Sequence, residues 1–149
     1  MAKEFKNLND LYSYIEKQIR SSLKSEVANT VVETMRKNIQ SEVYDVYEPK
    51  GYQRTYELMK KIEVGQKDDD TIFVENVRYD NWIDPATGDI YSNRHVAYIV
   101  ETGEGYMYDF PYYGVPRPFT EATRKELASS SKLNKAMEEG LKNRGLDVE

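Results

Sequence analysis

Two apolar stripes at helical spacing fill the first 40 residues and constrain the fold more than any other feature. Their members recur every three or four residues, a pattern typical of helices that bury one face. A strict spacing of four drifts by about 40° per step on an α-helix, so we expect a bend or break at the serines of residues 20–26. Asn7 or Asn9 suits the helix start, and Pro49 ends a helical region that we place at residues 8–46. The stripes are Leu8, Leu11, Ile15, Ile19 and Leu23, then Ala28, Val32, Met35 and Ile39.

A β-hairpin region follows at residues 60–92. Ile62 and Val64 precede an acidic turn, residues 71–79 follow it, and a second turn is expected at "DPATGD". We therefore expect two or three antiparallel strands in a small sheet.

A short helix is predicted at residues 94–102. Asn93 is a good N-cap, and Gly103 stands where a left-handed residue ends a helix. Residues 103–118 then form a loop, because glycine and proline interrupt both helix and strand.

The chain closes with a helical region at residues 120–143. Thr120 is a candidate cap, Gly145 a candidate end, and the serines at 129–131 a candidate interruption. We predict a single domain over residues 1–149. Its class is α+β, with N-terminal helices and a C-terminal helix flanking a small antiparallel β-sheet.

The formal net charge of −5 is concentrated in the middle of the chain. Residues 41–116 carry seven Lys/Arg and fifteen Asp/Glu, whereas the two flanking parts are slightly basic. Because nucleic-acid binding depends on Lys and Arg, we expect no sequence-specific nucleic acid partner. Asp68, Asp69 and Asp70, or Asp84 with Asp89, offer oxygen ligands to a hard cation, but neither spacing matches a calcium loop, which favours turn chemistry.

Other features limit the chemistry and the compartment. The chain has no cysteine, and no apolar run approaches the roughly 20 residues of a membrane span. The charged N-terminus lacks the apolar core of a signal peptide. We expect a soluble protein made in the cytoplasm, without membrane, metal or cofactor partners.

Catalytic candidates are few. His95 is the only histidine, and pairing it with Ser92 would rest on proximity in sequence alone. Glu101 and Glu104 would suit a carboxylate-based hydrolase, although glutamates beside Gly103 also fit a solvated helix end. A small cytosolic binding or regulatory module is the other alternative. We expect a protein that is not an enzyme.

The loop "ETGEGYMYDFPYYGVPRPFT" is unusually rich in aromatic rings. Large rings provide contact area at low entropic cost, so they suit an interface that becomes buried on assembly. Arg117, between two prolines, is a positioned donor for a carboxylate or a carbonyl, and Phe119 is expected in the core. The proposed interface residues are Tyr106, Met107, Tyr108, Phe110, Tyr112 and Tyr113.

Four segments, in order, resemble the small tail-completion or head–tail joining proteins of long-tailed bacteriophages and prophages of Gram-positive hosts. They are "VYDVYEPKGYQRTYELMKKI", "HVAYIVETGEGY", "RPFT" and "AMEEGLKNRGLDV". The resemblance implies a virion structural protein at the head–tail junction or tail. Its partners would be phage proteins of the connector or tail-tube side, and itself in a ring. In such a ring, Asp68, Asp69 and Asp70 would face the DNA channel.

Overall fold

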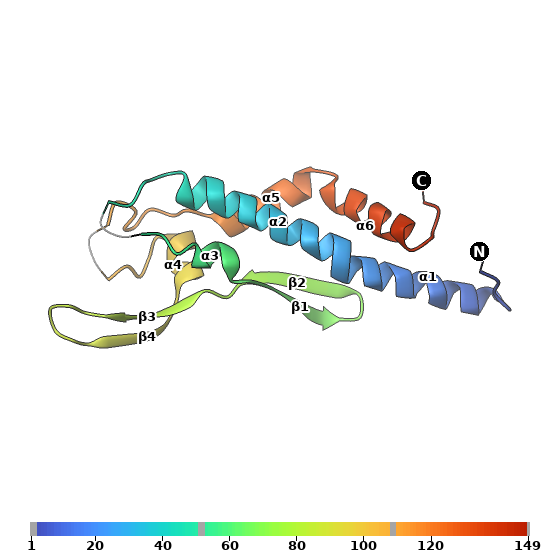
Figure 1. Ribbon diagram of the computed structural model, residues 1–149, viewed down its shortest axis with the longest axis horizontal. Coiled ribbons are helices and arrows are strands. Elements are labelled where there is room, and N and C mark those ends of the chain that lie inside the picture. The colour runs from blue at the N-terminus through green and yellow to red at the C-terminus, as the bar shows by residue number, and fades with distance from the viewer. Residues whose placement is uncertain (1–2, 51–52, 108–109, 149) are drawn as a thin grey trace.

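One long helical segment spans much of the molecule, and the other elements pack beside it (Figure 1). The computed structural model describes residues 3–50, 53–107 and 110–148. Asn7 caps the segment by accepting a hydrogen bond from the Asp10 backbone N–H at 2.9 Å. The segment consists of α1 (Leu8–Ser22), the π-helical turn η1 (Leu23–Val27), α2 (Ala28–Ile39) and the π-helical turn η2 (Gln40–Tyr44).

The chain stays helical at residues 20–26, where the sequence suggested a bend or break. The η1 turn lies there instead. A π turn accommodates extra residues because its hydrogen bonds run from i to i+5, so it realigns apolar side chains that a spacing of four would carry around the axis. Helical structure ends at Tyr44 rather than at residue 46.

In the part of the chain that the structure describes, four strands form two separate antiparallel hairpins, not one small sheet of two or three strands. β1 (Ile62–Asp68) pairs with β2 (Thr71–Asn76), and β3 (Tyr79–Ile83) pairs with β4 (Ile90–His95). The Asn76 side chain separates them, because its Nδ2 donates to the Leu58 carbonyl at 2.5 Å and its Oδ1 accepts from the Arg78 backbone N–H at 3.1 Å.

Two short helices differ from the sequence prediction. α4 (Val96–Thr102) begins two residues later than expected, because Asn93 belongs to β4 with a positive φ of 55° and does not cap the helix. The Asn93 backbone N–H donates to Asn81 Oδ1 across the hairpin at 3.0 Å. α3 (Glu57–Lys60) is a single turn that the sequence did not indicate, since four residues carry no periodic signal.

The C-terminal helical region is divided in two. α5 (Phe119–Ser129) and α6 (Lys132–Asn143) are separated at Ser130 and Ser131, as the serines suggested. Thr120 is not the cap of α5. The carboxylate of Glu101, on α4, accepts from the backbone N–H groups of Thr120 at 2.9 Å and Glu121 at 3.1 Å.

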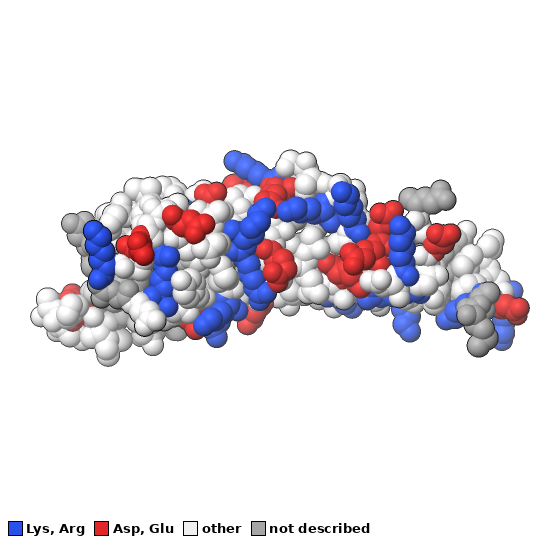
Figure 2. Space-filling view, turned by 45° about the horizontal axis from the view of Figure 1, so that its top comes forward, with Lys and Arg blue, Asp and Glu red and all other residues white. Residues whose placement is uncertain are grey.

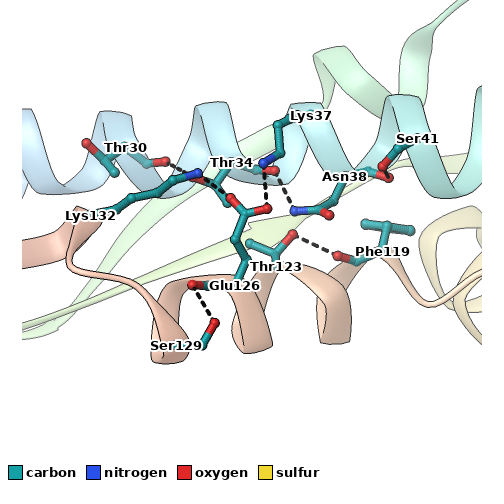
Figure 3. Close-up of polar contacts among 10 residues, drawn as sticks. All are labelled: Thr30, Thr34, Lys37, Asn38, Ser41, Phe119, Thr123, Glu126, Ser129 and Lys132. Atoms are coloured by element: carbon teal, nitrogen blue, oxygen red, sulfur yellow. Dashed lines mark hydrogen bonds and ion pairs between the residues drawn. The ribbon is translucent and has the colours of Figure 1, made fainter.

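The hydrophobic core lies where α2, η2, α3, α4 and the start of α5 meet. Phe119 and Ile39 are fully buried within it. Further along α5 from Phe119, Glu126 forms ion pairs with Lys37 of α2, with 2.5 Å between Nζ and Oε1, and with Lys132 of α6 (Figure 3). The core residues are Met35, Ile39, Val43, Tyr44, Leu58, Ala97, Val100 and Phe119.

The predicted α+β class is confirmed, with helices on both sides of the hairpins in sequence order. Among the described residues, no helix combines the length and the apolar character needed to cross a bilayer.

Candidate functional site

The ring-rich loop folds back onto the end of α4. Gly103 ends that helix with φ 75°, and its carbonyl accepts from the Gly114 N–H at 2.7 Å. A Cβ at position 103 would lie 2.6 Å from the backbone of Val115, so only glycine permits this approach. The Arg117 N–H donates to the Val100 carbonyl at 3.0 Å. Both ends of the loop are therefore fixed to one short helix.

Several rings of this loop pack around Tyr47, which follows the long helical segment. The Tyr47 ring lies 5.3 Å from Phe110 and 5.5 Å from Tyr112, and Phe110 lies 4.9 Å from Tyr106. The Tyr112 hydroxyl donates to the Val46 carbonyl at 2.8 Å. The sequence analysis expected these rings to become buried on assembly, but Tyr106, Phe110 and Tyr112 already pack within the monomer. Tyr47 lies about 60 residues away in sequence, so no local pattern indicates this packing.

The other loop residues of the predicted interface differ in exposure. Tyr113 is 60% exposed, while Met107 is partly buried. Tyr108 lies outside the described residues. Among the described rings of the loop, Tyr113 is therefore the one that remains exposed to a partner.

Arg117 lies beneath the rings and is only 5% exposed. Its Nη2 donates to the Tyr106 hydroxyl at 2.6 Å, and its Nη1 donates to the Val43 carbonyl at 3.4 Å. The guanidinium carbon lies 4.7 Å from the centre of the Tyr112 ring, a cation–π distance. Arg117 thus joins the loop to the end of the long helical segment, and Phe119 anchors the same turn in the core.

Arg54 also belongs to this site, and sequence reasoning did not single it out. Its guanidinium carbon lies 5.0 Å from the Tyr47 ring and 5.3 Å from the Tyr44 ring, and its Nη2 donates to the Tyr47 carbonyl. Burial raises the pKa of Tyr44 above its usual value. The recurrence of tyrosine around a single arginine in "YDVYEPKGYQRTY" was the available signal.

Rings and arginines together line a partly open cavity of about 190 Å³. Three arginines line it, Arg54, Arg78 and Arg117, along with the hydrophobic side chains of Leu58 and Val100. The described polar lining also includes the Glu57 carboxylate and the Thr55 hydroxyl, so the cavity offers both charged and neutral groups to a small ligand.

The acidic turn lies at the tip of the β1–β2 hairpin, away from this cavity. Asp70 pairs with Arg20 of α1, with 2.9 Å between Oδ1 and Nε, and this pair raises the pKa of Arg20. Asp68 Oδ1 accepts from the Asp70 backbone N–H at 2.9 Å. Asp68 and Asp69 are exposed. The hairpin tip is thus attached to the long helical segment through Asp70.

Two of the catalytic candidates, His95 and Glu101, line a pocket of about 350 Å³. Glu101 caps α5, whereas Glu104 is exposed beyond the end of α4. His95 stacks on Tyr79 with 4.6 Å between ring centres, and its Nε2 lies 3.3 Å from the Asn76 carbonyl. Within the described ranges, no three Asp, Glu or His side chains gather as metal ligands.

Comparison with known proteins identifies relatives of the whole chain. The sequence model of a family described as YomN matches residues 7–143. The SPbeta prophage-derived uncharacterized protein YomN of Bacillus subtilis strain 168 is 29% identical over 152 residues, covering 100% of both chains. No solved structure matches.

Proposed function

This chain belongs to YomN, a family of prophage-derived proteins, and from this membership we propose that it is a non-enzymatic structural protein of a phage virion. Its proposed task is tail completion or head–tail joining through ring or interface assembly. Its partners are further copies of itself and phage proteins of the connector or tail-tube side. It is made in the host cytoplasm and resides at the head–tail junction or tail.

The observation that carries this proposal is the uncovered apolar surface of the β3–β4 hairpin. Ile83 and Ile90 are cross-strand partners beside the turn and are 61% and 67% exposed. Tyr79, at the other end of β3, is 50% exposed. A lone two-stranded hairpin is marginally stable in water, and exposed apolar patches mark interaction sites. Burial against a partner would therefore stabilise this hairpin.

A second apolar surface lies on α1. Leu8 and Tyr12 are 65% and 57% exposed. α1 and the β3–β4 hairpin lie at opposite ends of the elongated molecule (Figure 1). Figure 2 shows acidic and basic side chains interleaved over the middle and few charges at the hairpin end. Two different surfaces at opposite ends suit head-to-tail contacts, which close into rings when the rotation permits.

Gene deletion tests the assignment directly. The gene is removed from its phage or prophage, and the induced lysate is imaged by electron microscopy. Separate filled heads and finished tails are expected if the protein joins them. Normal infectious particles would refute the assignment.

A surface variant tests the hairpin contact. Ile83→Ser combined with Ile90→Ser is expected to leave the circular dichroism spectrum unchanged and to abolish incorporation into particles. Tyr98→Ser is the matched control, because Tyr98 is 53% exposed but lies on α4 outside both surfaces. Equal incorporation of both variants would exclude the hairpin as an interface.

The acidic turn is proposed to face the DNA channel. Asp68 and Asp69 are exposed at the hairpin tip, and like charge there would keep the duplex from adhering during ejection. The repulsion is screened over about 8 Å at physiological salt. Changing Asp68 and Asp69 to lysine, while keeping the Asp70–Arg20 pair, should slow DNA ejection at low salt and less so at high salt. Unchanged ejection at low salt would place the turn outside the channel.

A further inference from the structure

The arginines of this chain divide into two groups. Five of the eight contact a carboxylate: Arg20, Arg36, Arg94, Arg124 and Arg144. For Arg54, Arg78 and Arg117, none of the described residues places a carboxylate oxygen within 4.0 Å. These same three line the 190 Å³ cavity beneath the aromatic loop. The three arginines that lack a carboxylate partner among the described residues therefore all line this one cavity.

Two of these arginines also retain unused hydrogen-bond donors. The Nε atoms of Arg54 and Arg117 are buried, and neither has an acceptor among the residues that the structure covers. Buried donors are normally satisfied, since an unmade hydrogen bond of a charged group is costly. Arg117 is more than nine-tenths buried, so bulk water does not compensate for the missing acceptor. Both of these cavity-lining guanidinium groups thus carry a donor that no described residue satisfies.

The rings hold the guanidinium groups in place without neutralising them. Tyr47 lies 5.0 Å from the guanidinium carbon of Arg54 and 5.5 Å from that of Arg117. A cation over a ring is attracted by the ring's quadrupole, which carries no net charge. Arg54 and Arg78 also both act electrostatically on the hydroxyl of Tyr44. Like charges remain close together, and an anion between them would relieve their repulsion.

Glu57 is the carboxylate among the described residues that line the cavity, and it does not fill this role. Its Oε1 lies 3.9 Å from Nζ of Lys60, the last residue of α3. Lys60 in turn donates to the Thr55 carbonyl at 3.0 Å. The Glu57 carboxylate therefore already places one negative charge at the cavity, which limits the negative charge that a ligand can add.

We infer that the cavity between Arg54, Arg78 and Arg117 binds a single carboxylate, carried by a glutamate or aspartate side chain of a neighbouring protein chain. The planar fork of a guanidinium matches a carboxylate with two parallel hydrogen bonds. A cavity of about 190 Å³ has room for a carboxylate on a short stem. The apolar lining by Leu58 and Val100 suits that stem.

Binding of the carboxylate is independent of the proposed virion role, whereas the identity of its carrier as a virion subunit rests on that role.

The experiment that tests the inference is an NMR titration. The full-length chain is labelled with nitrogen-15, and the arginine Nε–H signals are followed by NMR. The probes are N-acetyl-glutamate N-methylamide, its neutral glutamine counterpart of similar shape, and inorganic phosphate, each at equal ionic strength.

Saturable shifts of the Arg54 and Arg117 Nε–H signals with the glutamate probe alone are expected. Arg54→Gln and Arg78→Gln should each weaken this binding about tenfold or more, as expected for loss of a charge-assisted hydrogen bond. Arg36→Gln is the control, because Arg36 pairs with Glu33 elsewhere on α2 and its loss should leave the affinity unchanged. The circular dichroism spectrum of each variant verifies the fold.

Three results would overturn the inference. They are the absence of saturable shifts, equal shifts with the glutamine probe, and saturation by phosphate but not by the carboxylate. Because the measurement uses the isolated chain, it does not depend on particle assembly. Carboxylate binding together with normal particles in the gene deletion would retain the site and reject the virion role.

Discussion

Arg144, near the end of the chain, donates from Nη1 to both carboxylate oxygens of Glu26 in the η1 turn, at 2.8 and 2.9 Å. The same Nη1 lies 2.8 Å from the Gly140 carbonyl and 3.3 Å from Ser22 Oγ. Burial by itself would raise the pKa of Glu26, but the hydrogen bond from its own backbone N–H and the Arg144 pair lower it. This contact fastens α6 to the long helical segment.

Arg144→Met is therefore expected to destabilise the protein by about 1–3 kcal/mol, because it leaves the partly buried Glu26 carboxylate without its cation. Urea denaturation at pH 7 measures the difference. The matched control is Arg124→Met, which removes an exposed pair with Glu121 on one helix and should cost under about 0.5 kcal/mol. Similar losses in the two variants would mean that the Arg144 pair does not secure α6.

Gly140→Ala should destabilise the same contact by steric overlap. A Cβ at position 140 would lie 2.7 Å from Cβ and Oγ of Ser22, which is fully buried and has no room to move. Alanine favours a helix by about 1 kcal/mol over glycine, but overpacking costs about 1–3 kcal/mol. We expect a net loss of stability. Glu139→Ala, at the neighbouring exposed position, should be neutral, and a stabilised Gly140→Ala protein would disprove the close approach.

Glu101→Ala should cost about 1–2 kcal/mol, because it removes the acceptor for two backbone N–H groups at the start of α5. Glu104→Ala, beyond the end of α4, should change the stability by less than about 0.5 kcal/mol. Thermal unfolding followed by circular dichroism compares the two. Particle assembly should persist wherever the fold persists. Loss of assembly in a fully folded Glu101 or Glu104 variant would reopen the hydrolase alternative.

The Glu126 cluster should make stability depend on pH. Hydrogen bonds from Lys132 first, and from Lys37 second, lower the pKa of Glu126 (Figure 3). A carboxyl with a lower pKa in the folded state stabilises that state when ionised. This stabilisation is complete above the unfolded pKa of about 4.3 and is lost as the pH falls through the folded pKa.

Wild type should therefore unfold at a higher temperature than Glu126→Gln at pH 7, and the difference should shrink as the pH falls below about 4. Thermal unfolding of the two proteins across this range is the measurement. A difference that stays constant with pH would assign the effect to packing rather than to charge.

The sequence by itself determined those helices and helix ends that depend on residues close together along the chain. The apolar spacing in residues 8–39 predicts the long helical segment, Asn7 caps it, and Gly103 ends α4 in the left-handed conformation. These features depend on residues within about one turn of one another. The α+β class follows from their order along the chain.

Tertiary structure decided which distant polar groups meet. Glu101 rather than Thr120 caps α5, because packing of α4 against the start of α5 brings a carboxylate to that helix end. Asn76 divides the strands into two hairpins by binding the Leu58 carbonyl, 18 residues away.

The candidate site depends on the same kind of distant contact. Arg54 and Arg117 share the Tyr47 ring, although they are far apart in sequence. Spacing along the chain carries no information about such pairs, since closing a long loop is governed by the packing of the elements on either side of it. The sequence therefore indicates which residues have the chemistry of a site, and the fold decides which of them act together.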